Sequence, residues 1–333
     1  MTIAAGDGGQ RVRWEDELPI DPPPSDPAWR ENLCFDGYDA RTDLGFWVHM
    51  GRWPGAPELW REQVLVYAPG GDFWLHRGWG HRRSDKGASG ALLELTCEEP
   101  GAVWRLNYRG PARRTSSDEL RGAVSEAAQE LLELDLSFTT SDELWFMGPE
   151  IADQSWAHQH SEHTGRMVGT VNCGGRVVEV DMFAWRDHSR GPRHLGSHRR
   201  HCWIHGQLPN ERTFALTAIE SGPKGTADPS QFVQAVVWDR GTALPARCEN
   251  PPYIEDHASP PGNYTLHLSS PVGRYEIEAE VRRSLPHSTM VNGDAIDGVS
   301  PKAHIVTWEQ GVTFHVEGKP YDGHSERSHW IPQ

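Results

Sequence analysis

Residues 186–193, with the sequence RDHSRGPR, place an acid, an imidazole and three guanidinium groups close together in the chain. They follow a run of apolar residues that alternates as a strand does. Burying so much charge is unfavourable unless each group is paired. The cluster therefore indicates either a structural ion network that pins a hairpin to its neighbour or a site of proton chemistry.

Asp187 and His188 are the candidate catalytic residues of this cluster. On a regular strand they point to opposite faces, whereas a bulge or turn after Trp185 lets them converge. Protonating an alkene carbon or a leaving hydroxyl needs a strong acid and an aromatic wall that tolerates a carbocation. We assign the acid to Asp187, whose pKa nearby arginines would lower and burial would raise. The candidate substrate-binding residues are Arg186, Arg193, Trp185, Trp203, His49 and Trp47, with an ordinary core position as the alternative for His49.

A second ionisable group lies at residues 158–163, with the sequence HQHSEH. On a strand His158, His160 and Glu162 share a face, and two imidazoles with a carboxylate form a usable metal-ligand set. No HExxH spacing occurs, and phosphate-binding loops, nucleophile elbows and dinucleotide fingerprints are absent. We therefore expect no metal or cofactor, and we assign His160 and Glu162 to acid–base support at a pocket mouth. A His-rich metal enzyme is the weaker alternative.

Composition narrows the classes of partner. The 333 residues carry a formal net charge of −15 without a block of Lys or Arg, so nucleic acid and anionic membrane surfaces are poor partners. The five cysteines include no CxxC pair, which favours free thiols in a reducing compartment. Neither a signal sequence nor a membrane-spanning segment is recognisable. We expect a cytoplasmic protein that binds a hydrophobic small molecule, with homo-oligomerisation left open.

Short apolar runs between Gly, Pro and Asp turns predict an antiparallel, mostly β fold with little helix. The clearest unit is a hairpin of residues 167–171 and 176–185 around a Cys-Gly-Gly turn. A helix is predicted over 117–132, although the alternation over 131–138 favours a strand. The length suits two domains. The expected divisions are a polar arm at 1–28, a β-barrel-like domain at 29–149 and a second one at 150–333 that carries the RDHS motif.

The RDHS motif with Gly191 resembles that of the hydroxyneurosporene synthase (carotenoid 1,2-hydratase)-like family, a lipocalin-related group of tandem β-barrel proteins. Weaker similarities are spread over the chain, at 31–32, 37–39, 47–49, 51–52, 104–114, 165–169, 174–175, 323 and 326–327. The resemblance implies two lipocalin-like antiparallel β-barrel or sandwich domains in tandem, with a ligand cavity between or within them. It also implies addition of water to an isoprenoid double bond, or the pericyclic cyclisation found among lipocalin-fold relatives.

The chain departs from that family at two points. The hydratases carry an aromatic residue two positions after the motif His, where this chain has Arg190, which suggests a smaller or more polar substrate. Their second acid, on a later strand, has Glu220 as a guessed counterpart. The function expected is a cofactor-independent acid–base lyase or isomerase that hydrates, dehydrates or cyclises an isoprenoid-like alkene or allylic alcohol. The alternative is a non-catalytic lipocalin-type carrier of an apolar ligand.

Overall fold

The computed structural model describes residues 12–53, 55–82, 84–121, 128–194, 198–222, 229–290 and 295–331. Within these ranges strands dominate, and the helical elements are α1 (Trp14–Glu17) and the 3-10 turns η1 (Glu119–Arg121) and η2 (Pro149–Asp153). The predicted fold class, mostly β with little helix, is confirmed. No helix in the described part of the chain is long and apolar enough to cross a membrane.

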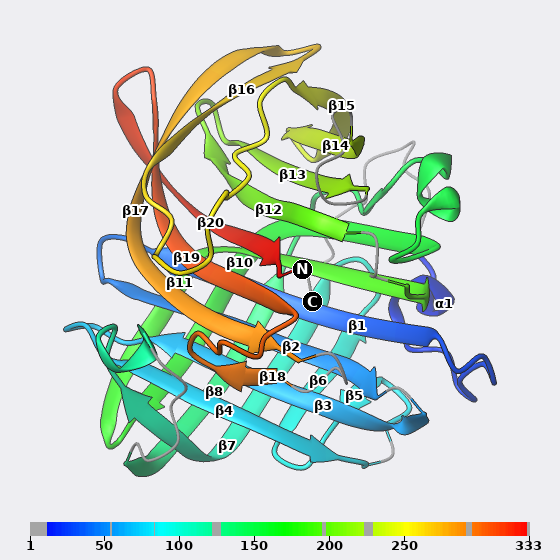
Figure 1. Ribbon diagram of the computed structural model, residues 1–333, viewed down its shortest axis with the longest axis vertical. Coiled ribbons are helices and arrows are strands. Elements are labelled where there is room, and N and C mark those ends of the chain that lie inside the picture. The colour runs from blue at the N-terminus through cyan, green and yellow to red at the C-terminus, as the bar shows by residue number, and fades with distance from the viewer. Residues whose placement is uncertain are drawn as a thin grey trace, which may run out of the picture.

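The first sheet contains eleven strands and closes into a barrel (Figure 1). Its strands are β1 (Trp29–Asp39), β2 (Leu44–Trp53), β3 (Ala56–Tyr67), β4 (Phe73–Gly80), β5 (Gly87–Ser89), β6 (Leu93–Glu99), β7 (Val103–Thr115), β8 (Gln129–Thr139), β9 (Trp145–Phe146), β10 (Gln159–Cys173) and β11 (Arg176–Pro192). They pair in the order β4-β3-β2-β1-β11-β10-β8-β7-β6-β5, with β9 beside β10. Antiparallel pairing of β4 with β7 closes the barrel.

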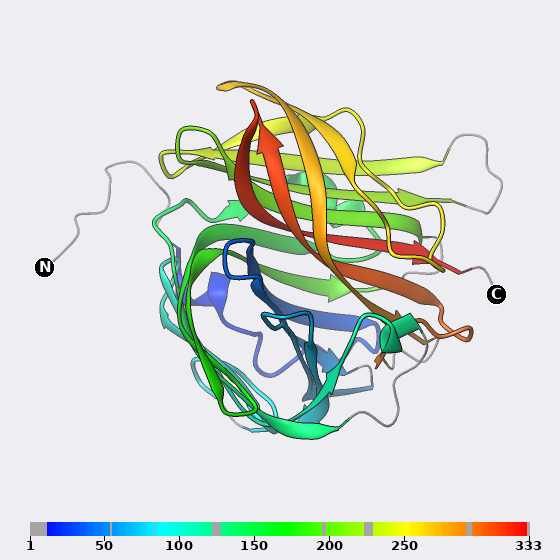
Figure 2. The ribbon, with the colours of Figure 1, turned by 90° about the vertical axis from the view of Figure 1, so that its left-hand side faces the viewer.

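The second sheet contains nine strands. They are β12 (His198–Leu208), β13 (Arg212–Ser221), β14 (Ser230–Asp239), β15 (Thr242–Cys248), β16 (Tyr264–Ser270), β17 (Gly273–Thr289), β18 (Ala295–Asp297), β19 (Ile305–Val316) and β20 (Lys319–Trp330). Their order is β16-β15-β14-β13-β12-β20-β19-β17-β18, and pairing of β16 with β17 joins the sheet into a ring. Figure 2 shows this sheet lying against the first one.

Local sequence explains the elements that were predicted correctly. The β10–β11 hairpin turns at Gly174 and Gly175, whose φ angles of 59° and 92° fall in the left-handed region that glycine tolerates.

The predicted helix is not observed in the described part of 117–132, where η1 and the start of β8 lie instead; residues 122–127 are outside the described ranges. Alternate β8 residues fill the barrel, namely Leu132, Leu134, Leu136 and Phe138. This period-two apolar pattern outweighs the helix-forming composition before it.

The two sheets do not divide at residues 149 and 150, where the sequence suggested a boundary. β10 and β11 complete the first barrel, because β11 pairs with β1 on one edge and β10 pairs with β8 on the other. The change of sheet therefore falls between Pro192 and His198. Whether each sheet is an independently folding domain stays a prediction.

The segment predicted as a polar arm contributes a buried carboxylate to the first barrel. Glu17, at the end of α1, is fully buried. One of its oxygens accepts a hydrogen bond from Arg186 Nη2 at 2.6 Å, and the other accepts one from Trp104 Nε1 at 2.6 Å. The Arg186 side chain is itself fully buried. Glu17 therefore neutralises a charge that the barrel wall encloses.

We expect the substitution Glu17→Ala to lower the free energy of unfolding by about 3–5 kcal/mol, because it leaves the Arg186 guanidinium buried without its counter-charge. Urea titration followed by tryptophan fluorescence measures the loss. Glu15→Ala, at an exposed position in the same helix, is the matched control and should leave the unfolding midpoint unchanged. Equal midpoints for the two variants would contradict the assignment.

Candidate active site

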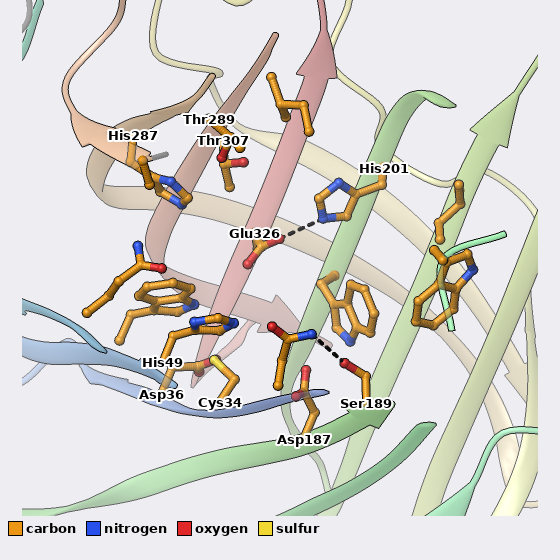
Figure 3. Close-up of a pocket in the computed structure, with 18 of the residues that line it drawn as sticks. Cys34, Asp36, His49, Asp187, Ser189, His201, His287, Thr289, Thr307 and Glu326 are labelled. Atoms are coloured by element: carbon orange, nitrogen blue, oxygen red, sulfur yellow. Dashed lines mark hydrogen bonds and ion pairs between the residues drawn. The ribbon is translucent and has the colours of Figure 1, made fainter. Parts of the chain in front are cut away.

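A cavity of about 210 Å³ lies between the two sheets. One wall is formed by β1, β2, β3 and β11 of the first sheet, and the other by β12, β13, β17, β19 and β20 of the second (Figure 3). Each wall belongs to a closed or ring-joined sheet that has an apolar core of its own. Side chains facing the cavity are consequently those that point away from both of these cores.

Asp187 lines this cavity from β11. Its side chain is half-buried, and within the described ranges no group donates a hydrogen bond to its carboxylate. Burial raises its pKa well above the ordinary value, and the negative charges of Glu162, Glu326 and Asp36 raise it further, while Arg193 opposes them. A carboxyl group in these surroundings holds its proton at a pH where an ordinary aspartate has lost it.

The other two ionisable residues of the motif point into the first barrel. His188 Nε2 lies 3.1 Å from Glu31 Oε1, and Arg52 Nε donates to Glu31 Oε2 at 2.9 Å. Arg186 pairs with Glu17, as described above. Of the two alternatives for Asp187 and His188, the structure shows the regular strand. β11 pairs in register with β1 from Arg186 through Pro192, so the two side chains point to opposite faces and do not converge.

Trp185 and Trp203 line the cavity as predicted, and Glu162 lies behind them. Trp185 Nε1 donates to Glu162 Oε2 at 3.3 Å, and Trp203 Nε1 donates to Glu162 Oε1 at 2.8 Å. His160 Nε2 is 2.9 Å from the same carboxylate, and its ring packs against Trp203. Glu162 and His160 are fully or almost fully buried. The structure thus places them where they support the aromatic wall rather than at the pocket mouth.

The first half of the chain contributes Trp47 and His49 to the cavity. Their rings stack with centroids 5.2 Å apart and an interplanar angle of 3°. Burial lowers the pKa of His49 well below its ordinary value, so this imidazole is neutral. Both residues line the cavity, and for His49 this is the pocket position rather than the ordinary core position that was the alternative.

Arg193 also lines the cavity. Its Nε donates to the Trp156 carbonyl oxygen at 2.8 Å, and its Nη2 donates to Ser189 Oγ at 3.2 Å. The Asn32 amide oxygen accepts from Nη2 at 3.1 Å. Burial lowers the pKa of Arg193 to about 10, which leaves the guanidinium charged at neutral pH. One cation is thus fixed at the same wall as Asp187.

The second sheet contributes an acid–imidazole pair that the sequence did not reveal. Glu326 of β20 faces Asp187 across the cavity, and its Oε1 lies 2.7 Å from His201 Nε2. The Nδ1 atom of His201 is buried without a partner in the described part of the chain. Glu220, the guessed second acid, instead pairs with Arg200 at 2.6 Å. Only the weak resemblance around Glu326 pointed to this strand.

The metal-ligand set of the weaker alternative, His158, His160 and Glu162, does not converge, because His158 is exposed whereas His160 and Glu162 are buried. Metal-type donor atoms gather elsewhere within the described ranges, at Asp36, His205 and His324. Two of these residues line the cavity.

Solved structures with the same fold include one of a protein named as a hydratase. CghA aligns with a TM-score of 0.57 and 12% identity over 92% of this chain and 89% of its own, and it has also been solved with Sch210972. A protein assigned as AttH (NE1406) from Nitrosomonas europaea aligns with a TM-score of 0.54 and 15% identity, over 91% of this chain and 92% of its own. Kievitone hydratase from Nectria haematococca aligns with a TM-score of 0.50 and 10% identity, over 90% of this chain and 88% of its own. At these identities the likeness shows the fold alone.

A search of curated proteins gives no match to the sequence. Residues 13–313, which span both sheets, match a family described as Domain of unknown function (DUF7064). This match covers most of the chain, including both walls of the cavity up to β19. The chain therefore belongs to the DUF7064 family.

Proposed function

We propose that this protein is a lyase- or isomerase-type enzyme whose acid is Asp187. Its substrate is an isoprenoid-like alkene or allylic alcohol, which the enzyme hydrates, dehydrates or cyclises. The observation that carries the proposal is a carboxyl group with a raised pKa on the wall of an inter-sheet cavity. The fold shared with kievitone hydratase, a hydratase by name, supports the same class.

Asp187 starts the reaction by giving its proton to the substrate. In hydration the proton goes to an alkene carbon, and in dehydration or cyclisation it goes to the departing hydroxyl group. Either step leaves a carbocation, which the electron-rich faces of aromatic rings stabilise. Trp47, Trp185 and Trp203 supply such rings on the two walls of the cavity.

His201 is positioned to complete the hydration. Water that attacks the carbocation must lose a proton, and the unpartnered Nδ1 atom of His201 accepts it. Its Nε2–H is held by Glu326, which fixes the ring and stabilises the imidazolium that forms. Asp187 regains a proton from solvent and His201 releases one, so no proton is gained or lost over the cycle. In dehydration, where Asp187 protonates the departing hydroxyl group, His201 accepts the proton that the carbocation loses as the double bond forms.

Glu162 acts as a positioning residue. Its carboxylate accepts from the indole N–H groups of Trp185 and Trp203, one from each sheet, and from Thr217 Oγ1 at 3.1 Å. These bonds fix the indole rings relative to each other. A cavity wall that must meet a short-lived cation benefits from rings held in advance.

Replacing the acid tests the proposed activity directly. We expect Asp187→Asn to lower kcat by about 10²- to 10⁴-fold, because the amide cannot supply the proton, while the dissociation constant of the substrate changes only a few-fold. A panel of terpene alcohols and isoprenoid alkenes, with products analysed by gas chromatography and binding followed by tryptophan fluorescence, gives both values. Asp181→Asn, on the solvent-exposed part of the same strand, is the control and should behave as wild type.

Two results would contradict the proposal. Undiminished turnover by Asp187→Asn would remove this residue from the chemistry. Tight binding of the panel by the wild type without any product would instead identify a carrier.

The pH profile should show the raised pKa of Asp187. A general acid works only when protonated, so kcat/KM should fall as the pH rises through that pKa, above the ordinary carboxyl value of about 3.9. The charged groups around it are Glu162, Glu326, Asp36 and Arg193. Because Arg193 opposes the rise, Arg193→Gln should move this alkaline limb to higher pH. An unmoved limb would show that another group titrates.

Weakening the hydrogen bonds that hold Trp185 and Trp203 should lower both the stability of the protein and its affinity for substrate. In Glu162→Gln the amide oxygen can accept fewer of the four hydrogen bonds that the carboxylate makes with Trp185, Trp203, Thr217 and His160, and we expect the free energy of unfolding to fall by about 1–3 kcal/mol. KM should rise more than kcat falls, because the wall positions substrate and does not donate the proton. Urea unfolding and steady-state kinetics measure these changes. Glu179→Gln, an exposed position on β11, is the control; an equal effect there would contradict the positioning role.

A further inference from the structure

Three buried donor groups meet between the two sheets, at one edge of the cavity. Asp36 comes from β1, His205 from β12 and His324 from β20. One donor atom from each residue lies within 4.8 Å of the other two. Asp36 Oδ1 is 2.6 Å from His205 Nε2 and 3.6 Å from His324 Nδ1. The set joins residues that are distant in sequence, and it is built by both barrels.

The three donor atoms have no hydrogen-bond partner among the described residues. Although Asp36 Oδ1 and His205 Nε2 are close, they do not meet with hydrogen-bond geometry, so this contact is not an ordinary Asp–His pair. All three side chains are 97% or more buried. Buried polar atoms without partners are uncommon, and each needs a physical reason. Their arrangement around a common point supplies one.

The separations suit ligands of a single small cation. With metal–ligand bonds of about 2.0–2.2 Å, two ligand atoms on one tetrahedral zinc ion lie about 3–3.5 Å apart. The distances from Asp36 Oδ1 to His205 Nε2 and to His324 Nδ1, 2.6 and 3.6 Å, lie on either side of that range. Two imidazoles and one carboxylate bind zinc in catalytic sites with an open position, and the same set suits other first-row divalent ions. Asp36 and His205 face the cavity, so an open position would face it too.

The surroundings of the histidines resemble the outer shell of a metal site. The second nitrogen of His324, Nε2, lies 3.4 Å from the Tyr67 hydroxyl and 3.7 Å from Glu309 Oε2. Ligating imidazoles commonly turn their other nitrogen to such groups, which fix the ring. The His205 ring is held by stacking on Trp185, with centroids 4.6 Å apart and an angle of 7°.

The protonation states agree with this reading. Burial lowers the pKa of His205 to about 3 and that of His324 to about 4, so both imidazoles are neutral at pH 7 and keep a lone pair for a metal. Burial raises the pKa of Asp36 to about 7, and a bound cation would favour its charged form.

We propose that Asp36, His205 and His324 bind one divalent transition-metal ion of the zinc class at the edge of the cavity. This departs from the expectation of no metal, which rested on the different set at residues 158–163. The site stands independently of the proton chemistry assigned to Asp187, because its ligands and its test do not involve that residue.

Direct metal binding tests the site. The full chain is stripped with a chelator, and its affinity for Zn²⁺ is measured by competition with a chromophoric chelator. Co²⁺ serves as a spectroscopic probe, because its visible spectrum reports coordination by nitrogen and oxygen. We expect one ion per chain. Asp36→Asn and His324→Ala should each weaken binding by more than about 100-fold, beyond the 10- to 100-fold typical of outer-shell changes, and should abolish the Co²⁺ spectrum.

Two further variants sharpen the result. Tyr67→Phe removes only the hydroxyl facing His324 and should weaken Zn²⁺ binding about 10- to 100-fold with little change in shape. His267→Ala removes an exposed imidazole on β16 and should bind as wild type. Circular dichroism establishes that each variant is folded, and Tyr67→Phe keeps the test decisive if a ligand variant does not fold. The proposal is overturned if the wild type binds no stoichiometric metal, or if folded Asp36→Asn or Tyr67→Phe binds as tightly as wild type.

Discussion

The structure depends on the pairing of β11 with a neighbour on both of its edges. Held by β1 and β10, this strand must alternate its side chains strictly between two faces. Arg186 and His188 therefore enter the first barrel, where Arg186 pairs with Glu17 and His188 lies within hydrogen-bond distance of Glu31. Asp187 faces the other way and receives no such partner among the described residues. One sequence motif thus supplies a structural ion network on one face and a candidate acid on the other.

The same constraint gives the cavity its electrostatic character. Both sheets direct carboxylates towards the space between them or close to it, and the described cations among the cavity-lining residues are Arg61 and Arg193. Negative charges confined in a poorly solvated region raise one another's pKa values. Hydrogen bonds limit this repulsion at two of the carboxylates, because Glu162 accepts from two indole groups and Glu326 accepts from an imidazole. Asp187 and Asp36 lack that compensation and keep raised pKa values, which makes them the candidates for proton transfer and cation binding.

Some cavity-lining residues could be predicted from the sequence, because they are close together in the chain or are tryptophans and histidines, which stand out in the sequence. Asp187, Trp185, Arg193, Trp203, Trp47 and His49 all line the cavity. The roles suggested for His160, Glu162, Arg186 and His188 did not anticipate their places behind the walls. Adjacent positions on a strand differ in the face they present, and a shift of one residue reverses that face. The register that fixes it is set by pairing with β1, whose partner residues lie more than a hundred positions away.

The sequence by itself determined the mostly β class and the Gly-Gly hairpin, because period-two apolar patterns and turn residues act locally. The concentration of charge at residues 186–193 was visible for the same reason. Tertiary structure alone decided that β10 and β11 complete the first barrel, that Glu326 and His201 meet across from Asp187, and that Asp36 joins His205 and His324. These contacts unite segments far apart in the chain, and only the packing of one barrel against the other brings their side chains within bonding distance.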